Sequence, residues 1–168
     1  MTPRLDGKIT LITGGTRGIG RAVAQAFAAA GATVVVNGRS PESTERAASE
    51  LSEGGAPVFW HATDVTDAAA VQAMIGAVVD AHGHLDILVH SAGISPFYKR
   101  AEDITEAEWD QVLTGNAKSA FLCDQAAGRT RATWAMPRRR SLSSLASSSA
   151  SAREISSVSS ATANREPK

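Results

Sequence analysis

A glycine-rich bend between an apolar run and a helical pattern constrains the fold of this chain most. Residues 9 to 27 read ITLITGGTRGIGRAVAQAF: a β-rich run ends at glycines, and apolar residues then recur with helical spacing. A strand that turns at once into a helix leaves little room for side chains, and glycine tolerates the dihedral angles of that turn. Gly14, Gly18 and Gly20 would also let a pyrophosphate approach the N–H groups at the helix N-terminus. The bend therefore predicts a strand–helix unit that can bind a dinucleotide, although glycines also mark ordinary tight turns.

Strand-like and helix-like patterns alternate along the first 127 residues. We expect strands at 8–13, 33–37, 57–61 and 86–90, and helices at 18–30, 41–53, 67–81 and 106–127. Ser40 before Pro41 is typical of a helix start, and Thr105 with Glu108 predicts a capping box. The alternation predicts an α/β fold, a Rossmann-like doubly wound parallel sheet covered by helices on both faces.

Composition changes near Gly128. Residues 1–127 carry nine basic and fifteen acidic side chains, whereas residues 128–168 carry eight basic and two acidic ones, so the whole chain is formally neutral. The second part is rich in serine, arginine and alanine and has little apolar periodicity. We expect two regions, with 128–168 a disordered tail, because such a segment buries too little to offset its ordering entropy. Short strands at 141–145 or 154–158 remain an alternative.

Several classes of protein are not expected. The single cysteine, Cys123, excludes an internal disulfide, and neither a leader pattern nor an apolar stretch near 18 residues is visible, which favours a cytoplasmic protein without membrane partners. His82 and His84 lie at an expected helix end, and no cluster with ligand spacing indicates a metal. The basic run 138–140 lacks any motif for nucleic-acid recognition. No Gly-x-Ser-x-Gly motif indicates a hydrolase.

Four stretches together resemble the short-chain dehydrogenase/reductase family, in particular its 3-oxoacyl-[acyl-carrier-protein] reductases. The resemblance covers residues 5 to 127 and rests on TGGTRGIG at 13–20, TDVTD at 63–67, LVHSAG at 88–93 and GNAKSAF at 115–121. It implies a Rossmann-like domain and hydride transfer between NADP(H) and a small-molecule carbonyl or secondary alcohol. In this interpretation residues 1–127 are an incomplete NADP-binding domain, and 128–168 are a tail or a degraded catalytic segment.

The end of the second expected strand bears on the choice between NADP and NAD. An NAD site usually places an acidic side chain there, whereas VVVNGRS offers Asn37 and Arg39. Arg39, aided by Arg17, can pair with a 2′-phosphate, which favours NADP; the alternative is two solvated surface arginines. The resemblance implies adenine contacts at Asp64 and Val65, although Asp64 can equally be a turn residue.

The stretch after the fourth expected strand departs from the family pattern. His90 and Ser91 stand where the family usually has two asparagines, and both can still form hydrogen bonds. The resemblance thus assigns cofactor binding to Gly14, Thr16, Arg17, Gly18, Ile19, Gly20, Asn37, Arg39, Asp64, Val65, His90, Ser91, Ala92 and Gly93.

The family's catalytic tyrosine and lysine have no counterpart in this sequence. Asn116 matches the active-site asparagine, and its mid-helix position favours a special role. Ser144 or, in another alignment, Ser157 matches the serine that polarises the carbonyl. No Tyr-x-x-x-Lys occurs, and Tyr98 lies in an expected loop. The missing general acid typically contributes about 100- to 10,000-fold in rate.

Three interpretations of the chain follow. It is an impaired NADP-dependent oxidoreductase with Asn116 and Ser144 in its site, a non-catalytic NADP-binding or interaction module, or a non-functional gene fragment. A frame change or truncation of an enzyme gene is our hypothesis for the altered second region. Family members form homo-oligomers, and we expect the interface to be incomplete here, with an apolar sheet edge left uncovered. The substrate stays open.

Overall fold

The computed structural model describes residues 4–131, which contain a four-stranded parallel sheet in the order β3-β2-β1-β4. The strands are β1 (Ile9–Thr13), β2 (Thr33–Gly38), β3 (Val58–Ala62) and β4 (Ile87–His90). In the register, Leu11 of β1 lies opposite Val35 of β2 and Leu88 of β4. Because β1 is central, the chain moves first to one side of it and then crosses to the other, as the alternating pattern predicts.

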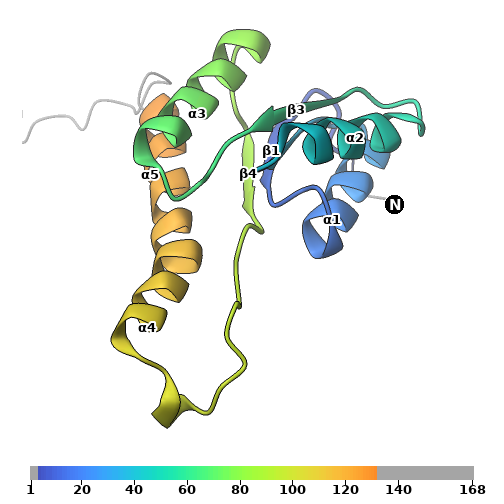
Figure 1. The fold of residues 1–168 in the computed structure, drawn as a ribbon. Helices are drawn as coiled ribbons and strands as arrows, with labels where there is room; N and C mark the ends of the chain where they lie inside the picture. Colours follow the sequence, from blue (N-terminus) through green and yellow to red (C-terminus); the bar gives the residue numbers. More distant parts are fainter. Residues whose placement is uncertain (1–3, 132–168) are drawn as a thin grey trace, which may run out of the picture. The chain divides into compact units, whose positions relative to one another are not determined.

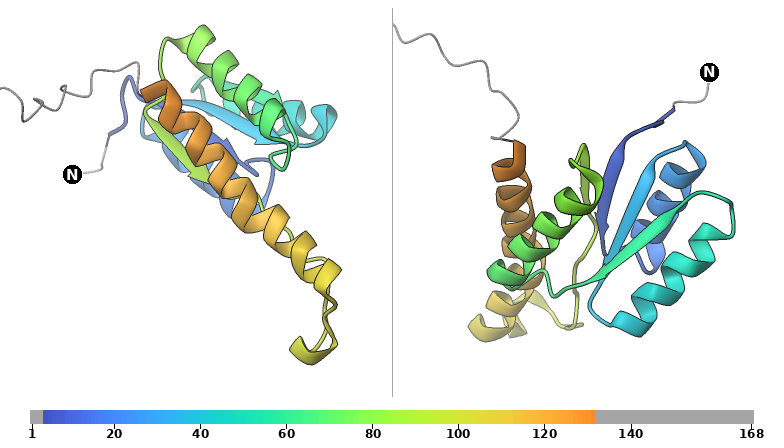
Figure 2. Two further views of the ribbon diagram at one scale, coloured as in Figure 1. Left: turned by 90° about the vertical axis from the view of Figure 1, so that its left-hand side faces the viewer. Right: turned by 90° about the horizontal axis from the view of Figure 1, so that it is seen from above.

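Helices cover both faces of this sheet (Figures 1 and 2). They are α1 (Gly18–Ala29), α2 (Pro41–Ser52), α3 (Ala68–His82) and α5 (Ser119–Arg131), whereas α4 (Glu106–Leu113) lies beyond the end of the sheet. Helices α1 and α2 lie on one face, and α3 and α5 lie on the other. The α/β fold class and all eight expected elements are confirmed, each within a few residues of its expected bounds.

Each face has its own hydrophobic core. On the α1 and α2 face, Ile12 and Val36 of the sheet pack with Ala24 of α1 and Leu51 of α2. On the α3 and α5 face, the buried residues are Leu11, Val35, Val71, Met74, Ile75, Val78 and Cys123, with several smaller neighbours. Strands β1 and β2 thus alternate between two buried faces, which explains their unbroken apolar runs.

The last expected helix is interrupted. Between α4 and α5, Thr114–Lys118 form a π-helical turn, labelled η2, and α5 continues to Arg131 instead of ending at 127. A short 3₁₀ turn, η1 (Ala101–Asp103), precedes α4. The segment from β4 to α4 runs beyond the end of the sheet before the chain returns (Figure 1).

Helix N-termini follow the expected capping chemistry, with one exception. Ser40, Asp67 and Thr105 accept hydrogen bonds from the first turns of α2, α3 and α4, and Thr105 with Glu108 forms the predicted capping box. The Lys99 ammonium and the capping bonds hold the pKa of Glu108 at about 2. Within residues 4–131, no side chain caps the first turn of α1.

Candidate functional site

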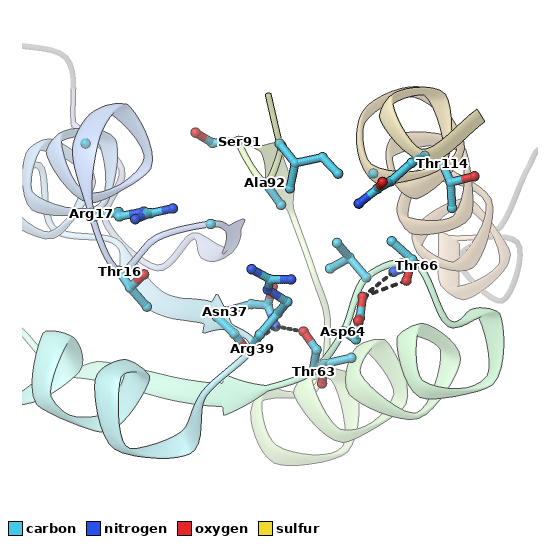
Figure 3. Close-up of a pocket in the computed structure, with 18 of the residues that line it drawn as sticks. Thr16, Arg17, Asn37, Arg39, Thr63, Asp64, Thr66, Ser91, Ala92 and Thr114 are labelled. Atoms are coloured by element: carbon cyan, nitrogen blue, oxygen red, sulfur yellow. Dashed lines mark hydrogen bonds between the residues drawn. The ribbon is translucent and has the colours of Figure 1, made fainter. Parts of the chain in front are cut away.

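A cavity of about 750 Å³ lies at the carboxyl ends of the strands (Figure 3). Its walls come from the glycine turn after β1, the end of β2, the segment after β3, the loop after β4, and α4 with the π-helical turn. This is the point where β2 and β4 diverge on the two sides of β1, the position at which open α/β sheets bind ligands. The predicted residues that line it are Gly14, Thr16, Arg17, Gly18, Ile19, Asn37, Arg39, Asp64, Val65, Ser91, Ala92 and Gly93.

Of the three glycines predicted to bind the pyrophosphate, Gly14 and Gly20 have no room for a side chain. Gly14 has a φ of +66°, and a Cβ there would lie 2.8 Å from the Ala92 backbone. A Cβ at Gly20 would lie 2.4 Å from the Gly14 carbonyl oxygen. Gly18 differs, because its Cβ would enter open space. Glycine at positions 14 and 20 therefore allows the turn to pack, while Gly18 leaves the approach to the helix open.

The N-terminus of α1 opens on this cavity. Arg17 occupies its N-cap position in an extended conformation, and its side chain makes no capping hydrogen bond. Gly18 and Ile19, the first residues of the helix, line the cavity. Helix N-termini carry partial positive charge and unpaired N–H donors, so this end provides donors for an anion.

The end of β2 has a buried amide instead of an acid. Asn37 is 1% exposed, and its Nδ2 donates to the carbonyl oxygens of His61 and Thr63, both at 3.1 Å. This side chain therefore ties β2 to the segment after β3. At the next residue, Gly38, a Cβ would lie 2.5 Å from Thr44 Oγ1 and 2.6 Å from Thr16 Cγ2. The side chains of Thr44 and Thr16 therefore occupy the space that a carboxylate at Gly38 would need, a feature not predicted from the sequence.

Two arginines without ion pairs border the same space. Arg17 and Arg39 are exposed and line the cavity, and neither forms a salt bridge within the described part of the chain (Figure 3). A second cavity, about 650 Å³, adjoins them and contains Arg21 and Arg46. Those two differ, because both pair with Glu50, at 2.7 Å for Arg21 and 3.8 Å for Arg46. Arg17 and Arg39 are thus the cations available to an incoming anion.

The segment after β3 presents a carboxylate and an apolar wall. Asp64 Oδ1 accepts hydrogen bonds from the Thr66 N–H at 2.9 Å and the Thr66 hydroxyl at 2.8 Å. These bonds lower the pKa of Asp64, and the Arg39 charge acts in the same direction. Val65 is 6% exposed and also belongs to the core beneath α3. Asp64 therefore closes a turn, as one interpretation expected, and it also lines the cavity. Its contact with adenine stays a prediction.

A threonine that the sequence analysis missed holds the loop after β4. Thr13 Oγ1 accepts hydrogen bonds from the N–H groups of Ser91 at 3.2 Å and Ala92 at 3.3 Å. His90 pairs with the same hydroxyl at 3.0 Å. The His90 side chain thus lies beneath the loop, while Ser91–Gly93 line the cavity. In the sequence Thr13 is typical of a strand residue. Only its position before the glycines could have indicated that it holds the loop after β4.

Asn116 lies in the π-helical turn and binds the far end of that loop. Its Oδ1 accepts from the Ile94 N–H at 3.1 Å, and its Nδ2 donates to the carbonyl oxygens of Ile94 at 2.8 Å and Val112 at 2.7 Å. A mid-helix asparagine with a special position is what the sequence indicated. Tyr98 is fully exposed. Ser144 and Ser157 lie outside the described residues.

The π-helical turn and its surroundings supply cavity residues that the sequence analysis did not single out. Besides Gly38, these are Thr63, Thr66, Ile94, Ala107, Asp110, Gln111, Thr114 and Gly115. Most come from α4 and η2, whose approach to the sheet depends on the long loop. No local pattern in the sequence fixes that approach.

Comparison with known proteins agrees with this geometry. A family model described as short chain dehydrogenase matches residues 8–139. The chain belongs to the short-chain dehydrogenase family. Relatives in this family include a D-threitol dehydrogenase of Mycolicibacterium smegmatis, 40% identical over 126 residues, which are 75% of this chain and 48% of that protein. A 3beta-hydroxysteroid dehydrogenase of Mediterraneibacter gnavus is 39% identical over 71% of this chain and 44% of that protein.

Solved structures of the short-chain dehydrogenase family show the same fold. A short-chain type dehydrogenase/reductase from Mycobacterium marinum superimposes with a TM-score of 0.74 at 34% identity, over 78% of this chain and 53% of that one. The chain therefore spans about half the length of the short-chain dehydrogenases that it matches. Among residues 4–131, no helix is long and apolar enough to cross a membrane, and no group of three or more His, Cys, Asp or Glu side chains is placed to hold a metal ion.

Proposed function

We propose that this chain binds NADP in the 750 Å³ cavity, with the pyrophosphate at the N-terminus of α1. The observation that carries the proposal is the first turn of α1, which has no side-chain cap and opens on the cavity through Gly18. The described residues thus fit a dinucleotide, because donors and space coincide where a phosphate is stabilised. Asp64 and Val65 would hold the adenine.

NADP is favoured over NAD by the charges at the end of β2. Arg17 and Arg39 are free of salt bridges within residues 4–131, and both line the cavity, where they would bind the 2′-phosphate. Asn37 uses its amide to hold backbone carbonyls, and Gly38 has no space for a carboxylate. An acidic partner for the ribose hydroxyls is therefore missing at this strand end.

As a short-chain dehydrogenase, the whole protein would transfer hydride between NADP(H) and a carbonyl or secondary alcohol. The cofactor, when bound, supplies the hydride chemistry. The described residues would orient it by holding the cavity wall in place. Thr13 lies beneath the Ser91–Gly93 loop and holds it, and Asn116 holds Ile94 at the end of that loop. Ser144, the predicted serine, would polarise the carbonyl.

A non-catalytic NADP-binding module is the second candidate. It is favoured by the sequence, which contains one tyrosine, Tyr98, and no Tyr-x-x-x-Lys. Tyr98 is fully exposed in the loop before α4. Binding and turnover are therefore two separate questions for this chain.

Titration of the purified protein with NADPH and NADH tests the binding, with nicotinamide fluorescence as the signal. We expect NADPH to bind more tightly, and Arg39→Ala to weaken NADPH at least tenfold while NADH changes little, because one charged hydrogen bond contributes about 1.5–3 kcal/mol. Arg100→Ala is the matched control, since Arg100 pairs with Glu102 outside the cavity. Equal affinity of the wild type for both nucleotides would overturn the NADP assignment.

Adding a panel of carbonyl compounds to the same cuvette separates the two candidate functions. NADPH oxidation that depends on a carbonyl would support the oxidoreductase. Selective NADPH binding without oxidation would support the binding module. Absence of binding to either nucleotide would overturn both candidates.

A further inference from the structure

His90 lies at the end of β4, where its ring is hydrogen-bonded on both sides. Nδ1 is 3.0 Å from the hydroxyl of Thr13 on β1, and Nε2 is 3.2 Å from the hydroxyl of Ser119 on α5. The ring is half-buried between these elements. A histidine held at both nitrogens by neutral hydroxyls has a defined protonation state only if the hydroxyls themselves are constrained.

The Thr13 hydroxyl is constrained by its other partners. A hydroxyl has one proton and two acceptor lone pairs. Thr13 Oγ1 accepts from the N–H groups of Ser91 and Ala92, and Ser91 shares its N–H with the main-chain oxygen of Thr13 at 3.2 Å. The hydroxyl proton is therefore left for His90 Nδ1, which must accept it and carry no proton of its own.

The Ser119 hydroxyl gives the complementary result. Its oxygen lies 2.9 Å from the Gly115 carbonyl oxygen and 3.1 Å from that of Asn116, and only the hydroxyl can donate to these acceptors. Ser119 Oγ therefore accepts from His90 Nε2. Both sides of the ring agree on one form, the neutral imidazole with its proton on Nε2.

This chain of hydrogen bonds joins two parts of the cavity wall. One end is the Ser91–Gly93 loop, and the other is the π-helical turn that carries Asn116, which in turn holds Ile94. We propose that neutral His90 is a positioning residue that couples the Ser91–Gly93 loop to the Asn116 turn, so that both walls of the cavity keep one geometry. The effect of this coupling on NADP rests on the proposed function, whereas the coupling itself does not.

Protonation would break the coupling, because a second N–H on the ring would meet the Thr13 hydroxyl, whose lone pairs are already used. Burial lowers the pKa of His90, against the opposing effects of the Asp124 charge on α5 and the Ala92 backbone. Cys123 on α5 stays neutral, because burial raises its pKa to about 11. On β1, the residue opposite His90 is Thr13, which does not titrate. The coupling is expected to be intact above pH 6.5 and to be lost as the pH falls below that value.

Long-range ¹⁵N–¹H spectra of the histidine-labelled full chain test the protonation state directly, with His90→Asn identifying the signal. We expect the Nε2–H tautomer at pH 7 and titration at lower pH than an ordinary histidine. An Nδ1–H tautomer, or a charged ring at pH 7, would overturn the proposal whether or not NADPH binds.

Amide hydrogen exchange tests the coupling. Ser119→Ala removes the far partner of the ring, and we expect exchange at the Ala92 amide to become about fivefold faster, the lower end of typical coupling between sites. Ser52→Ala on α2 is the matched control, because it also removes a serine hydroxyl bound to a helix carbonyl. In a His90→Phe background Ser119→Ala should have no further effect on Ala92.

Two results would overturn the coupling: an Ala92 exchange rate unchanged by Ser119→Ala, or one changed equally by Ser52→Ala. NADPH titration of Ser119→Ala at pH 7.5 adds a functional readout, with weaker binding than wild type expected. If wild type fails to bind NADPH while tautomer and exchange results hold, the proposed function fails and the coupling stands.

Discussion

Helices α1 and α3 begin in opposite ways. The first turn of α3 is closed by Asp67, whose Oδ1 accepts from the N–H groups of Ala69 at 2.8 Å and Ala70 at 3.1 Å. At α1 the corresponding position is Arg17, which caps nothing and lies beside the cavity. One helix satisfies its terminal donors with its own side chain, and the other leaves them for something outside the chain.

This difference has an energetic meaning. An N-cap side chain typically contributes about 1 kcal/mol to stability. The α1 turn forgoes that contribution and also requires Gly14 at a φ of +66°, a conformation costly for other residues. The uncapped first turn of α1 is therefore consistent with the proposed binding of a phosphate there.

The largest expected effect comes from closing the α1 turn sterically. Gly14→Ala should lower the free energy of unfolding by about 2–4 kcal/mol, because a Cβ there combines a strained φ with contact to the Ala92 backbone. NADPH binding should be lost with it. Gly76→Ala in α3 is the control, since no atom lies near a Cβ there, and it should be neutral or stabilising. Urea unfolding measures the change in free energy of unfolding for both variants. Equal destabilisation by Gly14→Ala and Gly76→Ala would contradict the steric need for glycine at position 14.

Removing the α3 cap is the next largest change. Asp67→Ala should lower the free energy of unfolding by about 1 kcal/mol, because two N–H groups lose their acceptor. NADPH affinity should stay within twofold of wild type, since Asp67 does not line the cavity. Thermal unfolding and fluorescence titration of the same sample check this. A loss of affinity comparable to that of Arg39→Ala would contradict the separation between the two helix ends.

Adding a cap to α1 should sharpen the comparison. Arg17→Ser and Arg17→Ala both remove a cation and should both weaken NADPH binding. Only serine can cap the helix, so Arg17→Ser should be about 0.5 kcal/mol more stable than Arg17→Ala. Urea unfolding of the pair isolates the cap from the charge. Equal stability of the two variants would mean that a serine at position 17 does not cap α1 as Asp67 caps α3.

The smallest expected effect concerns pH. Thr66 hydrogen bonds lower the pKa of Asp64 below its ordinary 3.8, so its contribution to stability is complete above that value and is lost as the pH falls through the lower folded pKa. Because Asp64 is largely exposed, we expect less than about 0.5 kcal/mol between pH 5 and pH 3. The Thr66 amide shift in NMR spectra should follow this titration. An unchanged profile in Asp64→Asn would assign the acid sensitivity to another group.

Local signals predicted most of the fold. Apolar runs such as VVVNG and caps such as Ser40 and Thr105 act within a few residues, so the strands and helices could be located from the sequence. Their ordering in a parallel sheet follows from the alternation, and the glycine turn located the cavity. The expected tail begins too early, because residues 128–131 belong to α5. The expectation for 132–168 stays a prediction, as do the roles of Ser144 and Ser157, because these residues lie outside the described ones.

Non-local contacts escaped prediction. Asn37 looked like a substitute for a cofactor-binding acid, yet its amide holds two carbonyls of the neighbouring segment. Thr13 and His90 meet across 77 sequence positions, and no periodicity encodes that pair. The interruption at Thr114–Lys118 was not predicted either, although Thr114, Gly115 and Asn116 suit a regular helix poorly.

That interruption makes the helical segment tolerant of one particular change in length. The wide turn at Thr114–Lys118 accommodates one more residue than a regular α-helix would, and α5 continues from it with Cys123 and Ala126 buried in the core. Deleting a single residue within this turn would leave a regular α-helix in which Cys123 and Ala126 keep their direction. Deleting one residue of regular helix between Ser119 and Cys123 would instead rotate both by about 100° and turn them out of the core.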